Sequence, residues 1–547
     1  MPRRLHAPLL ALCLVGSAAS AESPHPAAGI RPDAIRTHVE FLADDLLEGR
    51  GAGSRGYDIA AAYVAAQFRL YGLEPAGDDG SFLQHFDLVQ GLAIEGESSL
   101  VLRRDGREIA LKVRDDFVPF DNPLEADGAI EAPLAFAGYG ITAPELGFDD
   151  LGQVNLEGKV AVVLSGAPAS FPNSQRAYYS SSRLKFARLK AAGAVGVIAI
   201  STRVDQERVP WERVLTYTWR PSMGWRSADG RTSLDAVRMA AGVTVRTPAA
   251  APFFEGARMS LEEVLDAADA GEPVAFDLPG TVEIRTRNEL ATARSSNVLG
   301  ILPGSDPELK NEYVIITAHL DGVGFGLPVD GDAIYNGAWD NATGVGIVLE
   351  IARTLSEAGA PRRSLIFAAV GAEEFGLLGS DYFAEHPTVP IDSIVANVNI
   401  DMPYVAVPTT DFVAFGAEHT SLGGAARAAA KAEGYTLSAD PMPEEVIFVR
   451  SDQFSFVLRG IPAIYIDGGY TPVDPGHDVA ALTKAFLQSD YHQPTDDIRQ
   501  PIPYETLAGL GRVNTRVLTS VANEDARAAW TPGDFFGETF QGRMAAP

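Results

Sequence analysis

Apolar and polar positions alternate in regular blocks over the second half of the chain. Short apolar runs have the length and content of buried strands, and amphipathic stretches with helical spacing lie between them. The predicted strands cover residues 313–320, 364–371, 393–401 and 462–468, and the predicted helices cover 341–359, 377–386 and 422–434. Strands that alternate with helices form βαβ units, so the sequence predicts an α/β fold whose mostly parallel, mixed sheet is flanked by helices.

The first half of the chain shows two other patterns. Residues 30–90 carry two stretches of helical periodicity separated by a turn rich in Gly and Ser. Between about 125 and 285 the apolar runs are short, and those at 159–165 and 194–201 indicate buried strands on either side of a helical stretch. We therefore expect a pair of helices followed by a separate, β-rich α/β unit. Residues 24–29 and the chain after about 525 are expected to be poorly structured ends.

The first 21 residues have the composition of an export signal. Arg3 and Arg4 precede the apolar run "APLLALCLVG", and residues 19–21 form an A-x-A cleavage site. This run is well below the ~20 residues that span a bilayer, so we expect a cleaved signal peptide over 1–21 and an exported protein, periplasmic or secreted. Cys13 is the only cysteine and lies inside this segment, which excludes a disulfide framework or a thiol nucleophile in the mature chain.

Charge and composition indicate which classes of partner the protein is not expected to bind. The formal net charge is −28 at pH 7, and so acidic a surface repels both nucleic acid and anionic membranes. With 46% hydrophobic and 21% charged residues, the chain has the composition of a folded globular protein. We therefore expect neither nucleic acid nor membrane as a partner, and the sequence leaves the oligomeric state open.

Acidic and imidazole side chains gather where the predicted strands of the second half end. The carboxyl ends of parallel strands meet at one edge of a sheet, which is where sites form in such folds. The residues at these ends are His319, Asp321, Glu373, Glu374 and Asp401, and Asp340 begins the helix that returns from the first strand. Each acidic residue alone could be a helix cap, but carboxylates packed together repel one another unless a cation or a proton neutralises them. The group as a whole therefore predicts a metal site.

The spacing of these residues suggests which of them bind metal and which orient a ligand or face a metal-bound water. The carboxylate of Asp321 is expected to accept the second imidazole N–H of His319 and so to orient that ligand. Glu373 and Glu374 point in different directions, so that one can bind metal while the other faces a metal-bound water. A second histidine ligand is expected at His492, with His477 as the runner-up; the histidines read as structural are His38, His85, His386 and His419.

With these residues assembled, the chain resembles the co-catalytic di-zinc exopeptidases, a family that includes secreted aminopeptidases and glutamate carboxypeptidase. The matching pieces are "AHLDGVG", "IYNGAWDNATGVGIVLEIAR", "GAEEFGLLGSDYF", "NVNIDM" and "YHQPTDD". The stretches "GYGITAPELGFDDL" and "LKAAGAVGVIAI" are similar to the protease-associated domain that many members carry as an insert. The resemblance implies a zinc-exopeptidase fold of the phosphorylase/hydrolase-like type. It divides the chain into a peptidase domain over 28–124 and 286–525, an insert over 125–285 and a tail over 526–547.

The resemblance also implies roles for individual residues. One zinc ion would be held by His319 and Asp401 and a second by Glu374 and His492, with Asp340 bridging both; Glu373 would be the general base, with Asp321 beside it in the catalytic set. It further implies a cis peptide bond after Asp340. The positions expected to line the substrate pocket are Trp339, Met402, Arg450, Ser451 and Asp452. Trp339 and Gln453 depart from residues that are common in the family, which concerns the pocket more than the metal site.

The expected function is that of a secreted, zinc-dependent exopeptidase acting on peptides. An aminopeptidase is favoured because "DAIYNGAWDNATG" is more similar to the aminopeptidase members. One alternative is a carboxypeptidase of the glutamate carboxypeptidase type, in which Arg450 would bind the terminal carboxylate. The other is a non-catalytic binding protein on the same fold, which the complete set of ligands disfavours.

Overall fold

The computed structural model describes residues 25–541. The expected signal peptide lies outside these residues. Among the helices of the described part, none combines the length and the apolar character needed to cross a membrane.

A central sheet carries the parallel strands that the sequence predicts. Its core order is β17 (Ser364–Val370), β14 (Tyr313–His319), β18 (Ile394–Asn399) and β21 (Ala463–Asp467), and each neighbouring pair is parallel. The sheet continues antiparallel into β19 (Asp411–Phe415), which pairs in parallel with β20 (Thr436–Ser438). The predicted mixed sheet is therefore confirmed. Each predicted strand and helix of this half corresponds to an observed one, and their first and last residues differ by no more than three positions.

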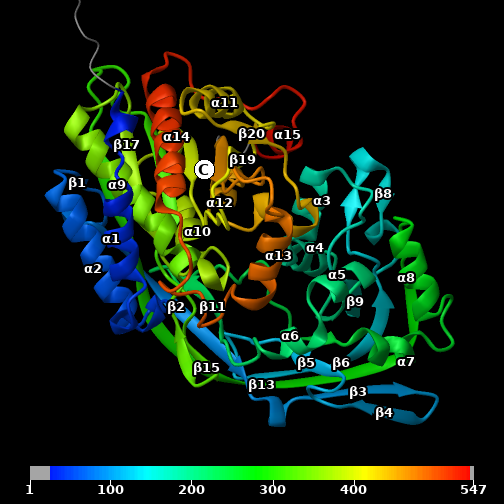
Figure 1. The fold of residues 1–547 in the computed structure, drawn as a ribbon. Helices are drawn as coiled ribbons and strands as arrows, with labels where there is room; N and C mark the ends of the chain where they lie inside the picture. Colours follow the sequence, from blue (N-terminus) through cyan, green and yellow to red (C-terminus); the bar gives the residue numbers. More distant parts are fainter. Residues whose placement is uncertain (1–24, 542–547) are drawn as a thin grey trace, which may run out of the picture.

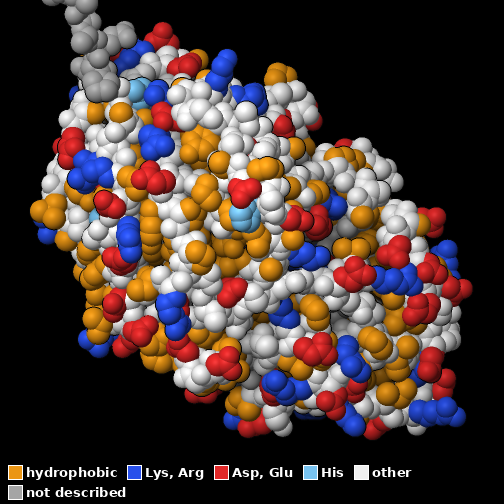
Figure 2. Space-filling view, viewed as in Figure 1, with side chains coloured by type: hydrophobic (Ala, Val, Ile, Leu, Met, Phe, Trp, Pro, Cys, Tyr) orange, Lys and Arg blue, Asp and Glu red, His pale blue; other side chains and the backbone are white. Residues whose placement is uncertain are grey.

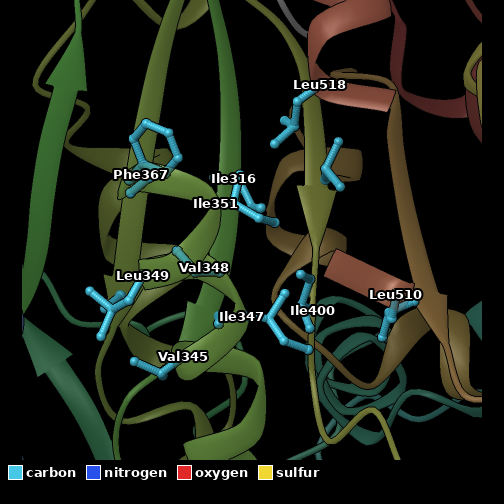
Figure 3. Close-up of a cluster of buried hydrophobic side chains, with 14 of the residues drawn as sticks. Ile316, Val345, Ile347, Val348, Leu349, Ile351, Phe367, Ile400, Leu510 and Leu518 are labelled. Carbon is cyan, nitrogen blue, oxygen red and sulfur yellow. The ribbon is translucent and has the colours of Figure 1, made fainter. Parts of the chain in front are cut away.

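Helices cover this sheet and bury its faces. The helices are α1 (Pro32–Leu42), α2 (Arg55–Leu70), α9 (Gly344–Ala358), α10 (Leu378–Glu385), α11 (Leu422–Ala432), α12 (Gln453–Val457), α13 (Val479–Ser489) and α14 (Tyr504–Asn523). Ile347 and Ile351 of α9 and Leu510 of α14 gather with Ile316 of β14 in one apolar cluster (Figure 3), and all four are fully buried. This packing of apolar helix faces fixes the strand ends from which the site is built.

A second sheet lies in the region where the sequence predicts a separate unit. Its strands run in the order β4 (Arg107–Leu111), β3 (Ser99–Arg104), β13 (Phe276–Leu302), β6 (Asp127–Phe136), β9 (Val160–Leu164), β10 (Gly196–Ile200), β12 (Ala241–Val245) and β5 (Phe117–Pro119). It is accompanied by α3 (Asn173–Ser180), α4 (Ser182–Ala191), α5 (Arg203–Arg208), α6 (Trp211–Leu215), α7 (Ala251–Phe254) and α8 (Leu261–Asp269).

One long strand joins the two sheets. The first half of β13 pairs with β3 and β6, while its second half pairs with β2 (Leu83–Ala93), β1 (Glu74–Pro75) and β17, and Figure 1 shows it running along the base of the molecule. The expected boundary between 285 and 286 falls inside this strand. In addition, β11 (Ser222–Arg226) pairs with β2, so part of the 125–285 stretch lies in the main sheet. Two small hairpins complete the strands, β7 (Thr142–Ala143) with β8 (Phe148–Asp149) and β15 (Gly324–Val329) with β16 (Asp332–Tyr335).

The C-terminal segment is packed down rather than loose, which corrects the expectation of a poorly structured end up to residue 541. Phe536 and Phe540 of α15 (Phe535–Phe540) are fully buried. His419 bridges this segment to α3, since its Nδ1 lies 2.6 Å from Oδ2 of Asp534 and its Nε2 lies 3.2 Å from Oγ of Ser174. Residues 26–29 are likewise ordered as a short 3-10 helix. Elsewhere the surface carries interspersed acidic and basic side chains, as Figure 2 shows for one face.

Candidate metal centre

Five residues from five separate segments meet at the carboxyl edge of the central sheet. His319 ends β14, Asp401 follows β18, Glu374 lies in the one-turn helix after β17, and His492 lies in the loop after α13. Asp340 lies in a π-helical turn, Ala338–Thr343, that leads into α9. The structure thus brings together all the residues that were expected to bind metal.

Asp340 is shared between two groups of donors. Its Oδ1 lies 3.0 Å from Nε2 of His319, which is in turn 2.9 Å from Oδ1 of Asp401. Its Oδ2 lies 3.3 Å from Nε2 of His492, which is 3.0 Å from Oε2 of Glu374. Within each group, the ligand atoms lie within 4.8 Å of one another.

The donor atoms fit two metal ions. An ion with four ligands at about 2.0–2.1 Å separates neighbouring ligand atoms by roughly 3.3 Å, close to the observed spacing. Imidazole nitrogen with carboxylate oxygen is a donor set that suits zinc. In addition, Oε1 of Glu374 is buried without a hydrogen-bond partner among the described residues, as expected for an atom that a cation would satisfy.

The electrostatics of the site favour a charged Asp340. Burial alone would raise the pKa of this carboxyl, but hydrogen bonds from His319 and His492 hold the pKa below its ordinary value. Glu373 differs, because burial raises its pKa well above the ordinary value of a glutamate. A carboxyl with a raised pKa holds a proton more readily and so suits a group that accepts and returns one.

Asp321 supports the site by a contact other than the expected one. The atom that faces Nδ1 of His319 is the backbone carbonyl oxygen of Asp321, at 3.1 Å. The Asp321 carboxylate instead accepts hydrogen bonds from the backbone N–H groups of Glu373 (3.0 Å) and Glu374 (3.3 Å). The expected bond from His319 to this carboxylate is therefore wrong, and Asp321 orients the two glutamates as well as the histidine.

Two buried residues that the sequence analysis missed hold the turn at Asp340. Asp496 accepts hydrogen bonds from the backbone N–H groups of Trp339 (2.8 Å) and Asp340 (3.1 Å). The guanidinium of Arg50 donates to the carbonyl oxygens of Gly337 (2.9 Å) and Leu320 (3.0 Å) and so joins the loops after β14 and β16. Burial lowers the pKa of Arg50 to about 10, so it stays charged at neutral pH. The only feature of the sequence that could have pointed to Asp496 is its position four residues after His492.

A cavity of about 500 Å3 opens beside the two groups. Its lining includes Glu373 and the ligands Asp340, Asp401 and His492, and of the expected pocket residues it includes Met402, Arg450 and Ser451. Arg450 is already paired, since its Nη1 lies 3.0 Å from Oε2 of Glu445. Tyr491, which was not predicted, also lines the cavity, and its ring stacks on that of His492 with centroids 3.8 Å apart.

Two of the expected pocket residues do not reach this cavity. Trp339 is 1% exposed and packs in the apolar core against Tyr404. Asp452 is also fully buried. Gln453, the other position that departs from the family, donates to the carbonyl oxygen of Phe448 (2.8 Å) and accepts from Asn399 (2.9 Å), so it packs inside the fold. The expected cis peptide bond between Asp340 and Asn341 is present.

Part of the chain is similar to known peptidases. Residues 297–518 match peptidase family M28. Aminopeptidase NAALADL1 of Mus musculus is 38% identical over 135 residues, which are 23% of this chain and 16% of that protein. Probable glutamate carboxypeptidase LAMP1 of Arabidopsis thaliana is 28% identical over 235 residues, 38% of this chain and 32% of that protein. The chain therefore spans less than a third of the length of either relative.

A solved structure extends the likeness over nearly the whole chain. The aminopeptidase from Aneurinibacillus sp. strain AM-1 superposes with a TM-score of 0.52 at 20% identity, and the match covers 93% of this chain and 98% of that one. At this identity the likeness establishes the fold.

Proposed function

We propose, from the match of residues 297–518 to peptidase family M28, that the protein is an exported, zinc-dependent exopeptidase that removes N-terminal residues from peptides. The observation that carries the proposal is the shared carboxylate of Asp340, whose two oxygens face His319 and His492. One zinc ion would be held by His319, Asp340 and Asp401, and a second by Asp340, Glu374 and His492, the two groups whose ligand atoms lie close together.

Hydrolysis in this proposal depends on a water and a proton carrier. The residues of these two groups would hold zinc, which when bound would supply a water of lowered pKa and a positive charge that polarises the carbonyl of the scissile bond. Glu373, which lines the cavity beside the ligands, takes the proton of the attacking water and passes it to the leaving amine. Asp321 fixes the backbone from which Glu373 projects. Tyr491 lines the same cavity, and burial raises the pKa of its phenol further above the ordinary value near 10, so the hydroxyl is protonated at neutral pH.

Two observations favour an aminopeptidase over a carboxypeptidase. The relative named as an aminopeptidase is 38% identical over its matched segment, against 28% for the one named as a probable carboxypeptidase. Arg450, the candidate receptor for a terminal carboxylate, is already paired with Glu445. A terminal carboxylate would have to compete with that ion pair.

A side-by-side assay tests the proposal. The purified mature protein is offered leucyl-4-nitroanilide and an N-acetylated dipeptide with a C-terminal glutamate, each with and without a zinc chelator. The expected result is turnover of the anilide alone, lost with chelator and restored by added zinc. Turnover of the blocked dipeptide alone would make the protein a carboxypeptidase, and no turnover of either would favour a binding protein.

Export is tested separately. The N-terminal sequence of the mature protein is expected to begin near Glu22, because cleavage follows Ala21. A mature chain that retains Arg3 and Arg4 would contradict the signal peptide.

A further inference from the structure

A segment of the 125–285 region reaches the metal centre. Nη2 of Arg220 lies 3.0 Å from the backbone carbonyl oxygen of Glu374 and 3.3 Å from Oε2 of its carboxylate. The guanidinium carbon lies 5.1 Å from the centroid of the Phe375 ring. The side chains of Arg220 and Glu374 are 11% and 2% exposed, so the contact is largely shielded from water.

The turn that Arg220 contacts has little regular structure of its own. Glu374 lies in a single 3-10 turn, Glu373–Phe375, and the residues flanking it, Ala372, Gly376 and Leu377, all have positive φ. From one side the turn is held by the Asp321 carboxylate, which accepts the backbone N–H of Glu374. Arg220 holds the same residue from the other side, through its carbonyl oxygen and its carboxylate. Together these contacts hold the backbone of Glu374 at both its N–H and its carbonyl oxygen.

Arg220 is itself anchored in the main sheet. Two residues later the chain enters β11, which pairs antiparallel with β2, and Figure 1 shows the two strands side by side. Ser222 donates to the Asp121 carboxylate through its backbone N–H and its hydroxyl, both at 3.1 Å. Within β11, Nε1 of Trp225 donates to Oδ2 of Asp381 at 2.7 Å. The arginine therefore lies in a bend that leads directly into a strand held on both sides of its first residues by the main sheet and the Asp121 carboxylate.

We infer that Arg220 is a positioning residue for the zinc ligand Glu374. The 125–285 region would then contribute a side chain that orients a metal ligand. The inference rests on the proposed function. Partners that orient a metal ligand act on metal affinity and on turnover, because a misdirected carboxylate binds the ion less well. Substrate binding is less affected, because Arg220 contacts the ligand residue and its neighbour Phe375.

The test compares Arg220→Ala, Arg220→Met and Arg220→Lys with a matched control. Arg238→Ala removes another arginine of the same region, whose Nη1 lies 2.7 Å from Oε1 of Glu125, a residue outside the five ligands. Zinc affinity is measured by competition with a chromophoric chelator, and kcat and KM are measured on leucyl-4-nitroanilide. Arg220→Met keeps apolar bulk against Phe375, which guards against a simple packing defect in Arg220→Ala.

Arg220→Ala and Arg220→Met are expected to weaken binding of one zinc ion by about 10- to 100-fold and to lower kcat in step. KM is expected to change by less than about 3-fold. Arg220→Lys is expected to recover part of the affinity, because lysine keeps the positive charge but lacks the planar guanidinium that lies over the Phe375 ring. Arg238→Ala should bind zinc as the wild type does. Wild-type zinc affinity and kcat in both Arg220→Ala and Arg220→Met, or an equal loss in Arg238→Ala, would overturn the inference. A wild-type protein that binds zinc but cleaves no peptide would overturn the proposed function, and the affinity comparison would still decide the role of Arg220.

Discussion

The Asp340 carboxylate faces His492 through Oδ2, at 3.3 Å from Nε2, while its other oxygen is turned toward a second histidine. One side chain thus belongs to both groups of donors. Asp496 and Arg50 hold the turn that carries it through backbone contacts, so its orientation does not depend on the carboxylate alone.

Replacing Asp340 with Ala is expected to remove both metal ions together. Each group would keep only two protein ligands, too few for tight binding of zinc. Elemental analysis of the purified variant should find well under one zinc ion per chain, and peptidase activity should fall by more than about 1,000-fold, since activity requires the metal pair. A variant that retained one zinc ion at full affinity would show that the aspartate is not shared.

The choice between His492 and His477 can be tested by metal content as well. His492→Ala removes a ligand of the second group and is expected to lower the zinc content by about one ion per chain. His477 is 45% exposed, with Nδ1 3.8 Å from the Asp474 carboxylate, so His477→Ala is the matched control and should bind zinc normally. Loss of zinc from the His477 variant alone would reverse the assignment.

Trp339 should matter for stability rather than for substrate binding. Trp339→Phe leaves a gap in the core and is expected to lower the free energy of unfolding by about 0.5–3 kcal/mol. Its KM should stay within about 2-fold of the wild type, because Trp339 does not line the cavity. Met402→Ala is the comparison, since Met402 does line it and its loss should raise KM. A KM that rose for Trp339→Phe and not for Met402→Ala would contradict this assignment.

A buried carboxyl away from the metal centre should make stability depend on pH. Burial raises the pKa of Asp150 to about 7, from an ordinary value near 3.9. The folded state therefore holds this proton more tightly than the unfolded state. Its contribution is fully present below about pH 4 and is lost as the pH rises toward 7, by an order of a few kcal/mol.

The melting temperature of the metal-free protein tests this, followed from pH 4 to 8 for the wild type and for Asp150→Asn. The amide cannot titrate, so the variant should lose less stability as the pH rises. Parallel curves for the two proteins would show that the carboxyl does not titrate in this range.

Much of the site could be predicted from the sequence because it lies at strand ends. His319, Glu374 and Asp401 follow apolar runs, and parallel strands bring their carboxyl ends to one edge whatever the details of packing. The direction of a side chain in an irregular turn carries no such signal. For that reason the spacing predicts a bond from His319 to the Asp321 carboxylate, whereas in the structure Nδ1 of His319 faces the backbone carbonyl oxygen of Asp321.

The supporting contacts could not be predicted, since they join segments far apart in the sequence. Arg50 reaches the loops at Leu320 and Gly337, and Arg220 reaches Glu374 across 154 positions. Likewise, periodicity identified strands in the 125–285 region but gave no sign that β13 continues through both sheets or that β11 returns to pair with β2. Pairing partners are set by tertiary packing, which a local pattern does not encode.

The role of Glu373 is the central claim about the chemistry, and one measurement tests it most directly. Glu373→Gln keeps the size of the side chain but cannot take up the proton of a water, while the metal ligands are untouched. Hydrolysis of leucyl-4-nitroanilide by this variant and by the wild type is compared at equal zinc content. We expect kcat to fall by about 100- to 10,000-fold with two zinc ions still bound. A variant that keeps near wild-type turnover with its zinc in place would contradict the account.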